Sequence, residues 1–467
     1  MKKIAFFSIP AHGHTNPMLP VAEELVKRGN IVRFYSFNEF EDKIRATGAE
    51  FISCDSHLPT LTEREELRIR NASVIEMMLH GIRISISINS FLDDEFNIFR
   101  PDIVYTDSVC FWGKLYAWKH NLPMVVSSST FAFNQMSCRY IKNTFKETVD
   151  AIFGIQRVFR EFRKLCLSNN YNIKNVLSLV VSDNQTNTIV YTSRSFQPYL
   201  ESFSDCYEFV GPSVFSKIEP NKEKIRPLVY ISMGTIVNYK LDFYIKCIEA
   251  LKTQNFDVVI SCGNIINPEN FGVLPDNIKV YTFVDQLDIL SKADVFITHC
   301  GMNSVSESLY MATPMVLYPQ TMEQHAVARR TLEIGAGFML TDDSSDGIYL
   351  AVCEILNNSK YSVAARACSI DFRSCSGING AAYFIENAPH SFSGVDIIRK
   401  LNIASFKFQL IYWLLIIIVI SFIGFLISWN YVWVISITAI ILSIPISKQL
   451  QKIKYASLVK KVSAQVK

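Results

Sequence analysis

Residues 294–307 read D-V-F-I-T-H-C-G-M-N-S-V-S-E, and this stretch decides which fold class we expect. Its first five residues form a short apolar run that is typical of a buried strand. A turn containing Gly301 follows, and a helix is predicted to begin near Ser304. The amino end of a helix presents free backbone N–H groups and a dipole end that suit a phosphate group. Ser304 and Glu307 also match a capping box, which could start any helix, so a purely structural role stays open.

The same alternation of strand and helix fills both halves of the chain. In the first half, Asn16 and Pro17 predict a helix start and Gly29 a helix stop. A second helix is expected over residues 39–46. Predicted strands span residues 4–9, 31–36, 50–54, 103–106, 188–192, 228–231, 257–260, 279–281 and 294–298. This order indicates α/β domains with doubly wound parallel sheets, in which ligands bind beyond the carboxyl ends of the strands.

Two such domains are predicted, because the alternation restarts after a break. Gly211-Pro212 and the charged stretch 217–227 mark the linker. We expect the two domains to face each other across a cleft that holds the ligands. The predicted segments are an N-terminal domain over 1–215, a C-terminal domain over 226–390, a membrane hairpin over 406–447 and a basic cytoplasmic tail over 448–467.

Composition excludes several classes of protein. The 467 residues include 46 Lys and Arg against 43 Asp and Glu, a formal charge of +3 that is too balanced for a nucleic-acid partner. Eleven cysteines occur without any C-x-x-C pair, which indicates neither a disulfide framework nor a zinc site. They are expected to be buried thiols in a reducing compartment.

Residues 408–447 contain no Asp, Glu, Lys or Arg, a length of about two bilayer crossings of roughly 20 residues each. A polar break at 428–431 predicts a hairpin, and lysines on both sides of the run place both ends in the cytoplasm. The alternative to a membrane hairpin is a pair of very apolar helices that are buried in a globular domain. A monotopic insertion also stays open, because the second span is short and contains Pro445. The apolar run after Lys3 is too short for a signal peptide, so we expect no export.

The stretch A-H-G-H-T-N-P carries His12 and His14 at the carboxyl end of the first predicted strand. The residues themselves allow metal binding, catalysis or an ordinary loop. A metal is disfavoured because no further cluster of ligands accompanies the pair. Asp107 follows the strand at 103–106, so it is expected at the same edge of the sheet.

Four motifs in this order resemble those of family 1 UDP-glycosyltransferases, and specifically the bacterial macrolide-glycosyltransferase branch. They are A-H-G-H-T-N-P-M-L at 11–19, Y-I-S-M-G-T at 230–235, F-V-D-Q-L-D-I-L at 283–290 and T-H-C-G-M-N-S-V-S-E-S-L at 298–309, the last followed by A-T-P at 312–314 and P-Q-T-M-E-Q at 319–324. The resemblance covers about residues 1–390. It implies a GT-B fold, with two Rossmann-like domains facing a cleft, and an inverting mechanism.

The resemblance also implies roles for single residues. His14 would be the general base that deprotonates the acceptor hydroxyl, and Asp107 would orient its imidazole. His12 is expected to be a loop residue. On the donor side, Phe283 would stack on uracil and Glu307 would bind the ribose hydroxyls. The other implied donor contacts, to base, diphosphate and hexose, are Ser232, Gly234, Thr235, Gln286, His299, Gly301, Asn303, Ser304, Glu323 and Gln324.

Three positions depart from the family pattern. Phe283 stands where plant members have tryptophan, which keeps the stacking surface. Asp285 replaces a proline, so we expect a less rigid loop there. Ala312 replaces a common glycine, which we expect to be a minor steric change.

These observations predict a UDP-dependent hexosyltransferase that needs no metal and no cofactor. Glucose is the first choice of hexose. The hairpin favours a hydrophobic acceptor, such as a macrolide or other polyketide, a phenol or a lipid-like alcohol, with the catalytic domains on the cytoplasmic face of the cell membrane. Two alternatives are a UDP-sugar epimerase and a non-catalytic nucleotide-binding membrane protein. Aromatic residues that could line the acceptor pocket, although most should be core, are Phe91, Phe111, Trp112, Phe131 and Phe133.

Overall fold

The computed structural model describes residues 1–70, 73–134, 137–141, 145–169, 176–180, 186–214, 219–221, 225–234 and 240–388. Residues 1–390 form one compact unit. The predicted hairpin at 408–447, the tail at 448–467 and Thr235 lie outside the described residues. Within the described ranges, no helix is both long enough and apolar enough to cross a bilayer.

The first sheet has seven parallel strands in the order β3-β2-β1-β4-β5-β6-β7. The strands are β1 Lys3–Phe7, β2 Ile31–Ser36, β3 Glu50–Ser53, β4 Ile103–Asp107, β5 Met124–Ser128, β6 Asn187–Val190 and β7 Tyr207–Phe209. Phe6 of β1 pairs with Phe34 of β2 and Tyr105 of β4, and all three rings are buried. These central strands are buried on both faces, which explains their nearly continuous apolar runs.

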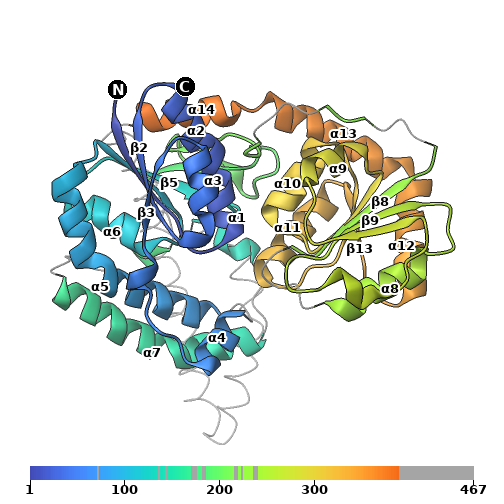
Figure 1. Cartoon of the computed structure of the whole chain (residues 1–467), viewed down its shortest axis with the longest axis horizontal. Coiled ribbons are helices and arrows are strands. Elements are labelled where there is room, and N and C mark those ends of the chain that lie inside the picture. The colour runs from blue at the N-terminus through green and yellow to red at the C-terminus, as the bar shows by residue number, and fades with distance from the viewer. Residues whose placement is uncertain are drawn as a thin grey trace, which may run out of the picture. The chain divides into compact units, whose positions relative to one another are not determined.

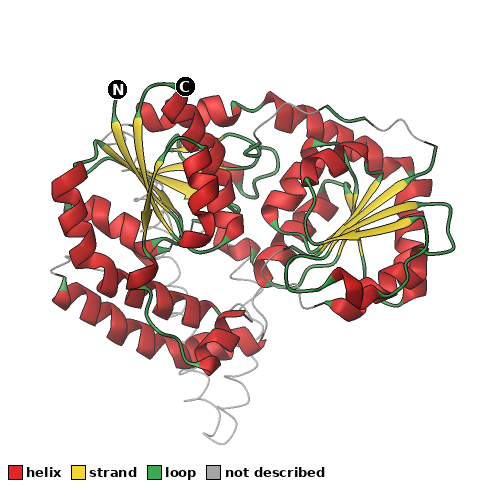
Figure 2. Cartoon of the chain, in the orientation of Figure 1, coloured by secondary structure: helices red, strands yellow, loops and turns green. Residues whose placement is uncertain are grey.

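The second sheet has six parallel strands in the order β10-β9-β8-β11-β12-β13. They are β8 Leu228–Ser232, β9 Asp257–Ser261, β10 Ile278–Tyr281, β11 Val295–Thr298, β12 Met315–Leu317 and β13 Gly337–Met339. The first six strands of the first sheet have the same order, so each sheet is a doubly wound Rossmann-like sheet (Figure 2).

Helices flank both sheets (Figure 1). In the first half they are α1 His12–Thr15, α2 Leu19–Lys27, α3 Glu41–Ala46, α4 Glu63–Arg70, α5 Val74–Phe99, α6 Phe111–Lys119 and α7 Phe145–Ser168. In the second half they are α8 Leu241–Leu251, α9 Gln286–Lys292, α10 Met302–Tyr310, α11 Met322–Glu333, α12 Ser345–Asn357, α13 Ser359–Ser374 and α14 Gly377–Glu386. Short 3₁₀ helices are η1 Asn16–Met18, η2 Asn38–Phe40, η3 Asp55–His57, η4 Ser137–Tyr140, η5 Val176–Leu179, η6 Leu200–Ser202 and η7 Pro268–Phe271.

The order of the strands reverses direction once in each sheet, and the candidate residues lie at those points. In the first sheet the connections leave β1 and β4 on opposite sides, and His14 and Asp107 lie at the ends of these two strands. In the second sheet Ser232 ends β8 and His299 follows β11. Such a switch point leaves a crevice in which α/β proteins bind ligands.

The last described helix, α14, returns to the first sheet. Its residues Ala381, Ala382 and Ile385 are fully buried in the core that also contains Leu25 of α2. Glu386 accepts a hydrogen bond of 2.7 Å from the Asn30 side chain. We predicted a C-terminal domain that runs to residue 390, but this helix packs with the N-terminal domain.

Two predicted helix starts are wrong. The two histidines were placed on a loop with Asn16 as the helix cap, whereas α1 already begins at His12 and Asn16 continues the helical path without a side-chain cap. The helix predicted to begin near Ser304 begins at Met302 with Gly301 as its N-cap. Ser304 therefore lies inside α10, and the predicted capping box with Glu307 does not form.

Ala312 has a positive φ of 56°, which is the left-handed region. The expectation of a minor steric change is therefore incomplete, because an alanine in this conformation carries a backbone cost that a glycine would not.

Helix α11 connects the two sheets' domains through arginines. The Arg329 guanidinium lies 3.4 Å from the centre of the Tyr140 ring and donates to the Tyr140 carbonyl. Arg330 donates to the Ser195 carbonyl at 2.6 Å and to the Phe196 carbonyl at 3.1 Å. The first turn of α11 carries Glu323, so the helix that bears this predicted donor residue is attached to the N-terminal domain.

Candidate active site

His14 and Asp107 are in direct contact. The His14 Nδ1 atom lies 2.8 Å from Asp107 Oδ2. The Asp107 side chain is fully buried, whereas the His14 side chain keeps 25% of its surface exposed. With Nδ1–H donating to the carboxylate, Nε2 carries the lone pair that can accept a proton. The pair has the geometry of a carboxylate-oriented base, as the sequence predicts.

The strand order explains this contact. β1 and β4 are neighbours with Phe7 opposite Thr106, so the chain segments that follow them begin side by side. Asp107 is the last residue of β4, and its Oδ1 accepts the Val109 backbone N–H at 2.9 Å. One carboxylate oxygen is thus fixed by the backbone and the other faces the imidazole.

Ser129 is a contact that sequence reasoning missed. It follows β5, and its Oγ lies 3.0 Å from His14 Nδ1, so it is a second oxygen beside the same nitrogen. β5 was not predicted as a strand. The signal that was available is the serine run 127–129 after an apolar pair.

A buried lysine supports the loop after β4. Lys114 of α6 donates to the carbonyls of Ser108, at 2.5 Å, and Leu179, at 2.6 Å. Burial lowers the pKa of Lys114 to about 8, and the nearby Asp107 charge opposes this shift. The two carbonyls hold the ammonium in place near the Asp107 carboxylate.

The electrostatic surroundings favour protonation of His14. Burial lowers its pKa, but the charge and the hydrogen bond of Asp107 together with the charge of Glu323 outweigh burial, and the net pKa is raised above its ordinary value of 6.5. Glu323 belongs to α11 in the second half of the chain. A predicted hexose-binding carboxylate therefore acts on the predicted base.

His12 has a different environment. Its Nε2 lies 3.6 Å from Glu39 Oε1, and its ring meets the edge of Phe40. Burial and the Lys43 charge lower the His12 pKa, against a smaller opposing effect of Glu39. These neighbours belong to the segment after β2, so His12 turns toward that segment and not toward Asp107.

His299 is held in a cradle of two glycines on the second sheet. A Cβ atom at Gly234 would come within 2.5 Å of His299 Nε2, and one at Gly301 within 2.6 Å. Gly234 also has a φ of 79°, in the left-handed region. Burial lowers the pKa of His299 to about 4, although a hydrogen bond with the Ser232 backbone opposes the shift. The imidazole is therefore neutral at pH 7.

The Nδ1 atom of His299 is buried, and no hydrogen-bond partner for it exists among the described residues. Next to it, Cys300 has a positive φ of 67°, an uncommon conformation for a residue other than glycine. A buried polar atom without a partner costs free energy unless a ligand satisfies it. His299 Nε2 lies beside Gly234 and Gly301, at the start of α10, so an imidazole nitrogen and the first N–H groups of the helix lie at one place, which suits an anion.

Three predicted donor residues come together beside this loop. Gln286 Nε2 donates to Glu307 Oε2 at 2.6 Å and lies 3.4 Å from Ser304 Oγ, while the Tyr230 hydroxyl donates to Gln286 Oε1 at 3.2 Å. Burial raises the pKa of Glu307 to about 7, partly offset by the hydrogen bond from Gln286. Tyr230 was not predicted as a site residue.

Phe283 and Asp285 precede this group. Phe283 is 77% exposed, so its ring is accessible to a flat partner. Asp285 has a φ of −67°, close to the value that proline enforces, and its side chain caps α9 by accepting the Asp288 N–H. The expected loss of rigidity at Asp285 is thus compensated by a helix cap.

Gln324 caps the amino end of α11. It forms a capping box with Thr321 at the start of α11, in which its Oε1 accepts the backbone N–H of Thr321 at 3.2 Å and of Gln320 at 2.8 Å. Only its amide N–H groups remain for a sugar hydroxyl. Glu323 beside it is exposed.

Asn303 bridges the two halves. Its Nδ2 donates to the backbone carbonyl of Gly13 at 2.9 Å. Together with the influence of Glu323 on His14, this contact brings the base and the α10 loop to the same place.

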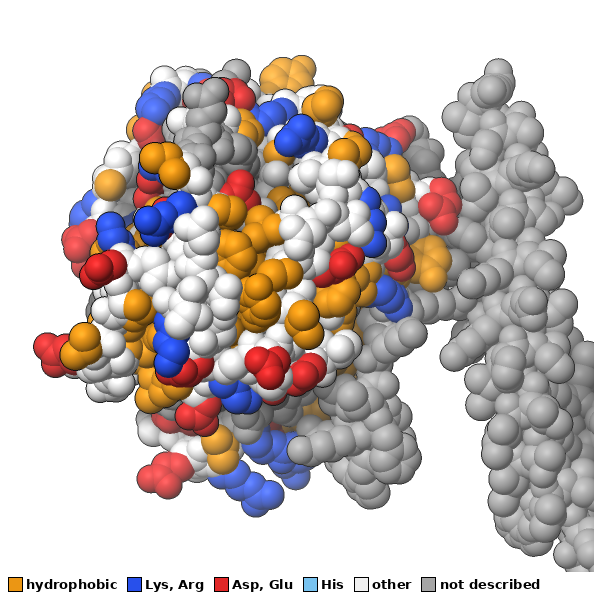
Figure 3. Space-filling view, turned by 90° about the vertical axis from the view of Figure 1, so that its right-hand side faces the viewer, with side chains coloured by type: hydrophobic (Ala, Val, Ile, Leu, Met, Phe, Trp, Pro, Cys, Tyr) orange, Lys and Arg blue, Asp and Glu red, His pale blue; other side chains and the backbone are white. Residues whose placement is uncertain are grey.

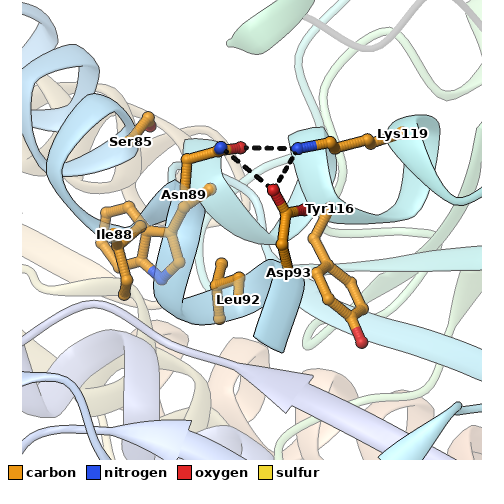
Figure 4. Close-up of a pocket in the computed structure, with 8 residues that line it drawn as sticks. Ser85, Ile88, Asn89, Leu92, Asp93, Tyr116 and Lys119 are labelled. Atoms are coloured by element: carbon orange, nitrogen blue, oxygen red, sulfur yellow. Dashed lines mark hydrogen bonds and ion pairs between the residues drawn. The ribbon is translucent and has the colours of Figure 1, made fainter. Parts of the chain in front are cut away.

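The aromatic residues suggested for an acceptor pocket are mostly core, as expected. Phe111, Trp112 and Phe131 are buried, whereas Phe91 and Phe133 are partly exposed. A crevice between α5 and α6 has no room for a water molecule, and Asp93 closes it through hydrogen bonds with Asn89 and Lys119 (Figure 4). No predicted catalytic or donor residue lines that crevice, so it is not the candidate site.

The site residues were predicted to need no metal, and the cysteines to form no disulfide framework. In the part of the chain that the structure describes, no group of three or more His, Cys, Asp or Glu side chains is placed to hold a metal ion. All eleven cysteines are described and are free thiols.

The sequence of this chain is similar to those of known glycosyltransferases. Residues 247–374 match the family described as erythromycin biosynthesis protein CIII-like, C-terminal domain. The NDP-glycosyltransferase YjiC of Bacillus licheniformis is 34% identical over 349 residues, which cover 72% of this chain and 84% of that protein. An uncharacterised UDP-glucosyltransferase of Bacillus subtilis, YojK, is 29% identical over 398 residues, 82% of this chain and 96% of that protein.

A solved structure has the same fold. The structure of the glycotransferase of kitacinnamycin superimposes with a TM-score of 0.70 at 24% identity, covering 83% of this chain and 98% of that one. The GT-B architecture of two parallel-sheet domains is thereby confirmed for the described residues.

The raised pKa of His14 gives the first testable prediction. Replacing Asp107 by Asn removes the charge that outweighs burial, so the His14 pKa should fall below its wild-type value. Histidine-selective labelling and NMR titration measure this, with His14→Gln assigning the signal and Glu39→Gln, beside His12, as the control. An unchanged or higher His14 pKa in Asp107→Asn would contradict the assigned environment.

Proposed function

This chain belongs to the family 1 glycosyltransferases, and on that premise we propose that it transfers a hexose, in the first place glucose, from a UDP-sugar to a hydroxyl of a hydrophobic small-molecule acceptor. One observation carries the proposal. His14, which Asp107 orients, lies close to the loop before α10 that suits an anion. The Asn303–Gly13 hydrogen bond connects the two, and the Glu323 charge raises the pKa of His14.

In the proposed reaction, His14 Nε2 removes the proton of the acceptor hydroxyl while its oxygen attacks the anomeric carbon and the bond to the UDP oxygen breaks. Asp107 stabilises the imidazolium that forms. Because the net pKa of His14 is raised, the base is strong, and the neutral form needed for catalysis increases with pH. A direct displacement of this kind inverts the anomeric centre.

The leaving diphosphate is proposed to lie at the start of α10. The free N–H groups of that helix and the neutral His299 can donate to its oxygens, and charge that develops on UDP is stabilised without a bound cation. Phe283 offers a stacking surface for uracil, and the Glu307 carboxylate accepts the ribose hydroxyls. The hexose hydroxyls are assigned to Glu323 and to the Gln324 amide.

The acceptor is proposed to be a macrolide or other polyketide, a phenol or a lipid-like alcohol. The match to an erythromycin biosynthesis domain supports a hydrophobic natural product. The uncharged stretch 408–447 supports attachment to the cytoplasmic face of the membrane, where such acceptors concentrate. The described unit also exposes hydrophobic side chains (Figure 3), and Ile245 of α8 and Leu350 of α12 are among the exposed ones.

Substitution of the base tests the reaction directly. His14→Ala should lower the rate of hexose transfer by about 10² to 10⁴-fold, the usual contribution of a positioned general base. UDP binding, measured by calorimetry, should stay nearly intact because the donor groups lie in the other half. His12→Ala is the matched control and should keep most activity, and EDTA should leave the wild-type rate unchanged. Loss of UDP affinity in His14→Ala would contradict the assigned roles.

Glu307 predicts how donor binding depends on pH. Its pKa is raised to about 7, so the free protein carries increasing amounts of the neutral acid below that pH. The ribose hydroxyls need the carboxylate as acceptor, so affinity for UDP-glucose should weaken as pH falls from 8 to 6, by up to about tenfold per unit. UDP-glucose is the suitable probe because its diphosphate does not titrate in this range. Glu307→Gln should abolish the trend, and a flat wild-type profile would contradict the assignment.

The membrane proposal has its own test. Deleting the residues after about position 400 should lower activity on an acceptor dissolved in lipid vesicles about tenfold or more, because the local concentration of acceptor is lost. Activity on a water-soluble phenol should change little. Equal activity of the truncated and full-length proteins on both acceptors would refute membrane attachment as the reason for the segment.

A further inference from the structure

The Asn303–Gly13 hydrogen bond connects residues 290 positions apart, at the two places where the proposed chemistry meets. Asn303 is the second residue of α10, whose neighbours Met302 and Val305 are buried in the core of the second sheet. Gly13 directly precedes His14 in α1. A side chain on a rigid helix thus holds the backbone of the segment that carries the base.

The Gly13 carbonyl needs an outside partner because of the sequence around it. In a helix this carbonyl would accept the N–H of the residue four positions on, which is Pro17 and has no N–H. The Asn16 N–H is already used by the His12 carbonyl. A partly buried carbonyl without an internal donor takes one from elsewhere, and the Asn303 amide supplies it.

α1 has four residues and continues through η1 into α2, so the Asn303 amide adds a contact from the other half of the chain to the first turn of this helical segment. The imidazole of His14 is oriented by Asp107 at its Nδ1 side, while the backbone that carries it is held by Asn303. Together with the Ser129 hydroxyl, these two contacts restrain where Nε2 lies. Misplacement of a catalytic group by about 1 Å costs on the order of 10²-fold in rate.

We propose that Asn303 is a positioning residue for the base: its amide connects the helix at the diphosphate end to α1 and sets the place of His14 relative to the bound donor. This inference rests on the proposed function and deepens it. The resemblance assigns Asn303 only to the diphosphate. One N–H of the Asn303 amide donates to the Gly13 carbonyl. The Asn303 side chain therefore connects the proposed diphosphate site with the segment that carries His14.

The experiment compares full-length wild type with Asn303→Ala and with a control, Ser306→Ala, on the same helix α10. The Ser306 Oγ is buried and has no hydrogen-bond partner among the described residues. At saturating UDP-glucose, Asn303→Ala should lower kcat about 10 to 100-fold. The Kd for UDP, from calorimetry, should rise less than about fivefold. Ser306→Ala should leave kcat unchanged. A diphosphate contact that is equally strong in the bound donor and in the transition state would instead raise the Kd and leave kcat at saturation unchanged.

A second variant approaches the same carbonyl from the other side. Pro17→Ala supplies an N–H that can bond Gly13 within the helix and compete with Asn303. It should lower kcat in the same direction as Asn303→Ala. The effects of the two substitutions should not add in the double variant, because both act on one hydrogen bond.

The outcomes separate the inference from its premise. If wild type forms no glycoside and binds no UDP, the proposed function fails. If wild type is active but Asn303→Ala keeps kcat within about threefold, or its effect adds fully to that of Pro17→Ala, the positioning role is overturned while the proposed function stands.

Discussion

The hydrogen bond between His14 and Asp107 is the interaction on which the site depends. It forms because β1 and β4 are neighbours in the sheet while their connections lie on opposite sides, so the residues after both strands meet at one edge. The second sheet repeats the same order of strands around β8 and β11, and its edge holds a loop suited to an anion. One topological rule used twice gives the proposed proton acceptor and the proposed phosphate site, and α11, α14 and Asn303 hold the two domains together.

Environment gives different chemistry to similar side chains. His14 and His299 both follow central strands, yet the Asp107 carboxylate raises the pKa of the first while burial lowers that of the second to about 4. Among the acids, Asp107 is bonded to a backbone N–H and an imidazole, whereas burial raises the Glu307 pKa to about 7. These differences agree with the proposed roles of His14 as the base, His299 as a neutral donor and Glu307 as a pH-dependent ligand for hydroxyls. A nucleotide-binding protein without catalytic activity would not need the hydrogen-bonded pair of His14 and Asp107.

Much of this could be predicted from the sequence, because apolar runs of strand length followed by Asp107 or by the glycine loop give both the parallel sheets and the edges where side chains gather. The contacts between residues that are distant in the sequence could not be predicted. The role of Ser129 depends on β5, which was not recognised, and Tyr230 joins Gln286 only through packing between β8 and α9. The apolar face of α14 does not reveal which sheet it covers. Local cues also misled: Ser304 with Glu307 resembles a cap, but Gly301 starts the helix and Glu307 binds Gln286.

The central claim is that a hydroxyl activated by His14 displaces UDP in one step across the shared edge of the two domains. The configuration of the product tests this most directly. With UDP-glucose, whose glucose is α-linked, NMR of the purified glycoside should show a β-linked sugar, since a single attack from the opposite face inverts the carbon. An α-linked product would contradict the account, because it would require a different mechanism from the one that this base and this cradle support.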